Sequence, residues 1–133
     1  MIYAKKNRVL LAFLSLIIIS PELFAIRALK SKADFNAAIN QTSGCVVIKF
    51  FATWCPPCTI LAKTLVADII PQYEDKVTFL EVDFDVCGAL AKKYGINSLP
   101  TLLFFKDGKK IHTIVGGLSA KKLSAELDKQ FNF

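Results

Sequence analysis

The stretch FFATWCPPCTIL, residues 50–61, decides the fold and the chemistry expected of this chain. It is apolar up to Trp54, then presents two cysteines separated by two prolines, and then becomes apolar again. Two cysteines at this spacing can form a disulfide that stabilises the fold, supply half of a metal site, or act as a redox centre. The elements on either side of the pair decide among the three.

Strands and helices are predicted to alternate along the chain. Runs of β-branched and aromatic residues predict strands, and apolar residues at helical spacing predict helices between them. An Asp-Gly turn at 106–109 predicts that the last two strands are antiparallel. Pro71 is expected to end the second helix. The expected strands are 25–29, 45–51, 76–84, 101–105 and 110–117, and the expected helices are 31–40, 59–70, 86–95 and 119–131.

This order predicts one layered α/β domain, in which a central mixed β-sheet is flanked by helices on both faces. The chain has 133 residues, of which 53% are hydrophobic, and a chain of this size can bury a core without disulfides. The close cysteine pair therefore needs a reason other than stability. The net charge of +6 comes from scattered lysines without a long basic run, so we expect no nucleic-acid partner.

The N-terminal residues have the pattern of a secretory signal peptide. A basic segment that ends at Arg8 precedes an apolar run at 9–19, and Ala25 offers a cleavage site. The run is short for a membrane span, which needs about 20 apolar residues. We therefore predict a signal peptide at 1–25 and an exported domain at 26–133, in a bacterial periplasm. The alternative is an uncleaved anchor that holds the domain on the periplasmic side of the membrane.

The position of Cys55 favours redox chemistry. It is expected between the end of a central strand and the start of a helix, where ligands of open α/β sheets bind. Free N–H groups and the partial positive charge of a helix N-terminus stabilise a thiolate there. Cys58 follows one helical turn later and can displace the sulfur of Cys55 from a mixed disulfide. The spacing thus predicts that Cys55 attacks and Cys58 resolves.

The two prolines are expected to set the reactivity of the pair. Pro56 suits the first helical position, where a missing N–H costs nothing. Pro57 removes a second N–H close to the sulfur of Cys55. We therefore expect the pKa of Cys55 to be lowered only moderately, which makes the disulfide less oxidising.

The other two interpretations have weaker support. A disulfide across so short a loop removes little entropy from the unfolded chain and stabilises weakly. A zinc site needs two more ligands, usually a second close pair, whereas Cys45, Cys87 and His112 are singly placed. We expect Cys45 to be buried as a small apolar side chain. Cys87 can be partly exposed and regulatory, but we favour packing for it as well, and we assign His112 no role.

Residues 26–131 resemble the thioredoxin family. The resemblance rests on VVIKFFATWCPPC, VTFLEVDFD, YGINSLPTLLFFKDGK and IVGGLSAKKL, in that order. It implies a thioredoxin fold, with Cys55 as the exposed nucleophile, Cys58 as the buried resolving thiol and Trp54 beside the site. It also implies a substrate groove with Pro100 in the cis form, formed by Leu99, Pro100, Thr101, Val115 and Gly116.

Lys49 departs from the family, which commonly has a buried acid at this position. Strand alternation directs the side chain of Lys49 inward, and Glu81 lies at the corresponding place on the parallel strand. The two can form a charge-swapped pair, in which Glu81, or Lys49 with a burial-lowered pKa, serves as the base for Cys58. Alternatively, Lys49 reaches the surface and has no role.

The resemblance implies a thiol:disulfide oxidoreductase whose only redox cofactor is the Cys55–Cys58 pair, without a metal. CPPC is similar to exported thioredoxins that reduce protein disulfides, including those that serve cytochrome c maturation. We therefore expect a monomeric reductase of protein disulfides that draws electrons from a membrane thiol relay. The alternatives are a periplasmic disulfide oxidase or isomerase, a copper-handling protein that uses the same two cysteines, and a non-catalytic binding module.

Overall fold

The computed structural model describes residues 26–133, and the predicted signal peptide lies outside the described residues. A five-stranded sheet in the order β1-β3-β2-β4-β5 forms the centre of the domain. Its strands are β1 (Arg27–Leu29), β2 (Cys45–Phe51), β3 (Val77–Asp83), β4 (Thr101–Lys106) and β5 (Lys109–Val115). The strands β1, β3 and β2 are parallel, whereas β4 and β5 are antiparallel to their neighbours, so the sheet is mixed as predicted.

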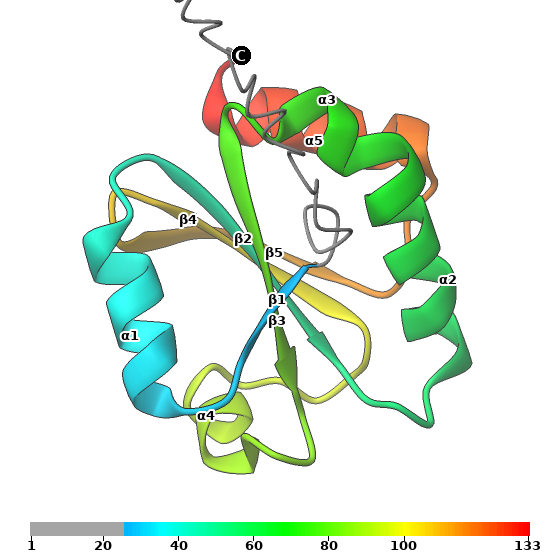
Figure 1. Cartoon of the computed structure of the whole chain (residues 1–133). Coiled ribbons are helices and arrows are strands. Elements are labelled where there is room, and N and C mark those ends of the chain that lie inside the picture. Colours follow the sequence, from blue (N-terminus) through cyan, green and yellow to red (C-terminus); the bar gives the residue numbers. More distant parts are fainter. Residues whose placement is uncertain (1–25) are drawn as a thin grey trace, which may run out of the picture.

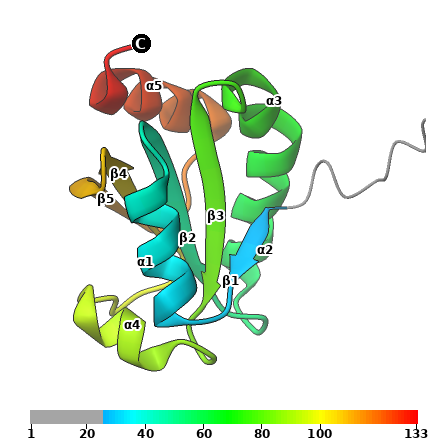
Figure 2. The same ribbon diagram turned by 60° about the vertical axis from the view of Figure 1, so that its left-hand side comes forward.

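Helices cover both faces of this sheet (Figures 1 and 2). One face carries α1 (Lys32–Gln41) and α4 (Gly88–Lys93), and the other carries α2 (Pro56–Thr64), α3 (Ile70–Tyr73) and α5 (Ala120–Phe131). This arrangement confirms the predicted fold class, and the predicted element boundaries differ from the observed ones by only a few residues in most cases. Within residues 26–133, no helix is both long enough and apolar enough to cross a membrane.

The central strand β2 is buried on both faces. Val46, Ile48 and Phe50 pack into the core beneath α1 and α4, whereas Cys45 and Val47 pack into the core beneath α2 and α5. Because side chains alternate along a strand, Lys49 belongs to the second face. The run of β-branched and aromatic residues in β2 therefore has the composition of a strand that is covered on both sides, and only its last residue, Phe51, is half-buried.

The prediction that Pro71 ends the second helix is wrong. The chain passes from α2 through a π-helical turn, η2 (Leu65–Ile69), directly into α3, which contains Pro71. In this turn the N–H of Ile70 donates to the carbonyl of Leu65, five residues back. A proline ring clashes with the carbonyl four residues earlier in a regular α-helix, and the wider π-helical turn relieves this constraint. The helix therefore continues past Pro71 to Tyr73.

The predicted Asp-Gly turn joins β4 to β5. Asp107 has φ of 50° and Gly108 has φ of 77°, as expected for the tight turn that matches the twist of a hairpin. The turn is also attached to the loop before β2, because Gly44 and Asp107 exchange two hydrogen bonds of 3.0 Å. A side chain at position 108 would lie 3.3 Å from the carbonyl oxygen of Ile39, so both the positive φ and the close packing favour glycine.

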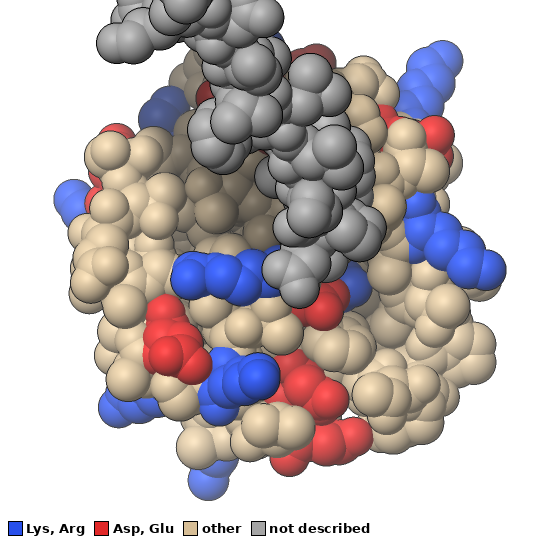
Figure 3. Space-filling model, in the orientation of Figure 1, with Lys and Arg blue, Asp and Glu red and all other residues tan. Residues whose placement is uncertain are grey.

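Basic and acidic side chains are interspersed over the face of the molecule shown in Figure 3. They do not gather there into a continuous basic surface of the kind that binds nucleic acid.

Ser31 and Ser119 are the N-caps of α1 and α5, and comparing them tests whether the capping hydrogen bond stabilises its helix. The Ser31 side chain accepts a 3.0 Å hydrogen bond from the N–H of Asp34 at the start of α1, whereas the Ser119 side chain makes no such bond at the start of α5. We predict that Ser31→Ala lowers the free energy of unfolding by about 0.5–2 kcal/mol and that Ser119→Ala lowers it less. Urea unfolding of both variants measures the difference, and equal losses would contradict this account of the caps.

Candidate active site

The two cysteines of the CPPC motif lie where β2 ends and α2 begins. Cys55 is the N-cap of α2, and its N–H donates to the carbonyl of Ala52 at 3.2 Å across a tight turn. Its sulfur is bonded to that of Cys58, with a Cα–Cα distance of 5.3 Å. The predicted placement of the pair at a strand end and a helix start is therefore confirmed.

A single helix N–H is directed at the sulfur of Cys55. The N–H of Cys58 donates to the Sγ atom of Cys55 at 3.3 Å. Pro56 and Pro57 occupy the two positions before Cys58 and have no N–H to offer. The helix N-terminus thus presents one donor to this sulfur, as expected from the two prolines.

Both cysteines are buried in this oxidised state. Cys55 is 4% exposed and Cys58 is 2% exposed, and they pack against Ala52, Phe51 and Leu99. The expected contrast between an exposed Cys55 and a buried Cys58 is therefore wrong for the disulfide form. The bond directs the sulfur of Cys55 inward to Cys58, and the side chain of Leu99 packs against the pair.

Trp54 is held next to the disulfide by an acid that the sequence did not single out. Trp54 is 66% exposed, and its Nε1–H donates to Oδ2 of Asp85 at 2.7 Å. Asp85 follows β3, the parallel neighbour of β2, so the two loops emerge at the same edge of the sheet. An acid just after the carboxyl end of a neighbouring strand is the signal by which Asp85 can be found in a sequence.

Backbone contacts connect the predicted groove residues to one another and to the disulfide. The Leu99–Pro100 peptide bond is cis, as the resemblance implies, and Leu99 contacts the cluster that contains both cysteines. The carbonyl of Pro100 accepts a 2.8 Å hydrogen bond from the N–H of Gly116. Thr101 is paired with Val115 in the β4–β5 register. The backbone thus joins the two segments that carry these five residues, although the side chain of Thr101 is buried at 2% exposure.

The thioredoxin family model matches residues 27–129 of this chain. The chain belongs to the thioredoxin family. It is 37% identical over 105 residues to thioredoxin 1 of Synechococcus elongatus, covering 79% of this chain and 97% of that protein. It is also 38% identical over 97 residues to a thioredoxin of Staphylococcus aureus, covering 73% of this chain and 90% of that protein.

Solved thioredoxin structures agree with this assignment. The thioredoxin of Malassezia sympodialis superposes with a TM-score of 0.68 at 34% identity, covering 80% of this chain and 90% of that one. Mitochondrial thioredoxin 3 of Saccharomyces cerevisiae, in its oxidised form, gives a TM-score of 0.71 at 32% identity, covering 78% and 94%. This thioredoxin-family protein is accordingly a thiol:disulfide oxidoreductase that acts through the Cys55–Cys58 pair.

The charge-swapped pair, one of the two alternatives for Lys49, is present in this thioredoxin domain. Nζ of Lys49 lies 2.8 Å from Oε2 of Glu81, and the two residues are register partners on β2 and β3. Lys49 is 3% exposed, so the alternative that its side chain reaches the surface is wrong. Its ammonium also lies 4.9 Å from the centre of the Phe51 ring.

The remaining two cysteines are separate from the site. Cys45 and Cys87 are both unbonded and buried, as expected for small apolar side chains. Burial raises the pKa of the Cys45 thiol, although Lys106 partly opposes the rise. Burial also raises the pKa of the Cys87 thiol, and the carboxylates of Asp83 and Asp34 add to it. Both groups therefore favour the unreactive thiol over the thiolate.

Among residues 26–133, no group of three or more His, Cys, Asp or Glu side chains is arranged to hold a metal ion. His112 lies 3.6 Å from Glu126 of α5 and is remote in the fold from the cysteine pair.

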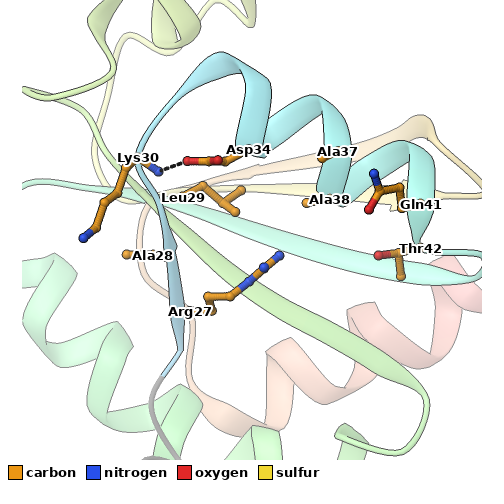
Figure 4. A pocket seen from close by; sticks show the side chains of 9 residues that line it. All are labelled: Arg27, Ala28, Leu29, Lys30, Asp34, Ala37, Ala38, Gln41 and Thr42. Atoms are coloured by element: carbon orange, nitrogen blue, oxygen red, sulfur yellow. Dashed lines mark hydrogen bonds between the residues drawn. The ribbon is translucent and has the colours of Figure 1, made fainter.

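A hollow of about 340 Å³ lies between β1 and α1 (Figure 4). Arg27 and Lys30 are among the residues that line it, and the backbone N–H of Lys30 donates to Asp34 at 3.1 Å. None of the residues that line it is a cysteine.

The two prolines can be tested separately. An N-cap side chain accepts from the N–H of the second or third helical residue, so Pro57→Ala adds a donor near the sulfur of Cys55, whereas Pro56→Ala adds one that points elsewhere. We predict that Pro57→Ala lowers the pKa of Cys55. Each further pH unit by which that pKa falls below the assay pH stabilises the reduced form about tenfold and raises the potential by about 30 mV.

Thiolate absorbance and equilibration with glutathione measure both quantities, and Pro56→Ala is the matched control. An equal change in both variants would show that the effect comes from proline removal in general rather than from the added donor.

Proposed function

We propose that this thioredoxin-family protein is an exported reductase of protein disulfides. The observation that supports the direction of the reaction is the single N–H donor directed at the sulfur of Cys55. Few donors stabilise the thiolate weakly, and a weakly stabilised thiolate leaves the dithiol ready to give up its electrons. The potential expected on this basis is closer to the value of about −270 mV typical of thioredoxin than to the value of about −120 mV of a strong oxidant.

The reaction proceeds in two exchanges. The thiolate of Cys55 attacks one sulfur of the substrate disulfide, so that a Cys55–substrate bond forms and the first substrate thiolate leaves and takes up a proton. The thiol of Cys58 then loses its proton, attacks the sulfur of Cys55 and releases the second substrate thiolate, which is protonated in turn. The substrate gains two electrons and two protons, and the Cys55–Cys58 disulfide remains.

The surface beside the disulfide suits an extended polypeptide. We assign Leu99, Pro100 and Thr101 to one wall of the substrate groove and Val115 and Gly116 to the other, with Trp54 at its end. Val115 is 63% exposed and Trp54 is 66% exposed, so an apolar surface is open to the substrate. Pairing with the backbone of Leu99 would make binding tolerant of the substrate sequence.

The cellular setting follows from the N-terminal pattern. A cleavable signal at residues 1–25 places residues 26–133 outside the cytoplasm, where the cytoplasmic thiol-reducing systems do not reach. The disulfide left after each turnover must then be reduced by a membrane thiol relay. We further propose that the protein works as a monomer, since one chain supplies both cysteines and the whole groove.

Trapping of substrates tests the reductase assignment. We predict that Cys58→Ala accumulates mixed disulfides between Cys55 and client proteins in the native host, because resolution is blocked after the first exchange. Non-reducing electrophoresis followed by identification of the adducts measures this. Cys55→Ser/Cys58→Ala is the matched control and should trap nothing. A wild-type potential near −120 mV, or stoichiometric copper on the reduced protein without insulin reduction, would contradict the proposal.

Export is tested by fractionation of the native host. We predict that the mature protein is recovered in the periplasmic fraction and that its N-terminal sequence begins at Ile26. Recovery in the membrane fraction with residues 1–25 intact would support the anchored alternative. Recovery of the full chain in the cytoplasm would show that export is wrong.

A further inference from the structure

The buried charge of Lys49, beside the active site, is not explained by a gain in folding stability. Lys49 is the one buried charged side chain among residues 26–133. Burying a charge is costly unless it is paired, and Glu81 provides the pair. Replacing a buried ion pair by apolar residues is nevertheless often neutral or stabilising. The reason for a lysine here is therefore to be sought in what lies next to it.

A hollow connects the ion pair to the resolving cysteine. It has a volume of about 230 Å³, and Lys49, Glu81 and Cys58 all line it. Thr53 and Thr59 line it as well, so its wall offers hydroxyl groups in addition to the two charges. One water molecule occupies about 30 Å³ of liquid and needs two to four polar partners. The hollow is thus roomy and polar enough for several waters between the charges and the sulfur.

Among the described residues, no other titratable group lines this hollow. On β4 the residue opposite Lys49 is Leu102, and on β1 the residue opposite Glu81 is Ala28. The part of α2 that lines the hollow contributes Cys58, Thr59 and Ala62. The ionisation of Cys58 on this side is therefore governed by the Lys49–Glu81 pair and by water. The side chain of Glu81 is 21% exposed, so the hollow is open to solvent at this residue.

We propose that the ammonium of Lys49, held in place by Glu81, stabilises the thiolate of Cys58 across this hollow and thereby speeds the resolving step. The proposal rests on the thiol–disulfide exchange described above. When Cys58 attacks, its proton passes to water in the hollow, its electron pair forms the bond to the sulfur of Cys55, and the substrate thiolate leaves and is protonated from solvent. Lys49 stays protonated throughout, and Glu81 keeps it in position.

The ammonium of Lys49 affects the resolution rate in two opposing ways: it raises the thiolate fraction of Cys58, and it lowers the nucleophilicity of that thiolate. A nearby cation favours the thiolate, and lowering the ionisation midpoint of Cys58 by one pH unit raises the thiolate fraction about tenfold. A thiolate of lower basicity is also a weaker nucleophile, with a sensitivity of about 0.4–0.5. The net gain in resolution rate at neutral pH is therefore about threefold to fourfold for each pH unit by which the midpoint falls.

The experiment compares four variants of the protein. Lys49→Met removes the cation, Lys49→Met/Glu81→Gln removes both charges, Glu81→Gln removes only the carboxylate, and Lys49→Arg keeps the cation. Lys63→Met is the matched control, because Lys63 is an exposed lysine on α2, the helix that carries Cys58. Ionisation of Cys58 is followed by thiolate absorbance in a Cys55→Ser background, and thermal unfolding of each variant confirms that it is folded.

The resolution rate is followed by rapid mixing with an aromatic disulfide that releases a coloured thiolate. The first exchange with Cys55 releases one coloured thiolate, and attack by Cys58 releases the second.

Support for the proposal requires a consistent pattern across the variants. Lys49→Met and the double variant should raise the ionisation midpoint of Cys58 by about one pH unit and slow the second release about threefold to fourfold. Lys49→Arg and Lys63→Met should not raise the midpoint, and Glu81→Gln should raise it less than Lys49→Met does, because it frees the ammonium but also removes a negative charge. An unchanged midpoint in the double variant would overturn the proposal, and so would an equal rise in Glu81→Gln, which would assign the role to the carboxylate.

The titration needs no substrate, so its outcome is independent of whether the protein reduces disulfides in the cell. A protein that fails to reduce insulin but shows the Lys49-dependent change in midpoint would contradict the proposed function and not this inference. A reductase whose Cys58 titrates identically with and without Lys49 would contradict this inference alone.

Discussion

Burial of β2 on both faces is the constraint on which the active site depends. A strand enclosed by helices on either side cannot bend toward solvent, so the chain that leaves it at Phe51 emerges at a fixed edge of the sheet. The next residues turn directly into α2, and the first N–H of that helix meets the sulfur of Cys55. The same enclosure places Lys49 beneath α2 and obliges it to find a partner within the sheet.

Local patterns in the sequence were sufficient to predict the elements that carry the chemistry. The alternation of strands and helices, the CPPC pair at a helix start and the Asp-Gly turn each depend on a few neighbouring residues, and all three are found. The Lys49–Glu81 pair is a contact between distant parts of the chain. It was predictable because parallel neighbouring strands fix which residues lie side by side.

Features that depend on the packing of the whole domain were harder to predict. Pro71 breaks a helix according to local propensity, but α2 and α3 cover one continuous apolar face, and a π-helical turn preserves that cover. Asp85 meets Trp54 only because two loops leave the same sheet edge. The burial of Cys55 in the disulfide form involves contact with Leu99, which is distant in the sequence and cannot be read from the motif itself.

The two unbonded cysteines have a consequence for a protein that is meant to cycle between redox states. Four cysteines can be joined into two disulfides in three ways, and an oxidising compartment would allow any of them in a loose chain. In the folded domain, Cys45 is enclosed in the core on one face of the sheet and Cys87 in the core on the other. The sheet itself separates them, so they cannot pair with each other in the folded domain, and the Cys55–Cys58 bond is the disulfide that forms among the four cysteines.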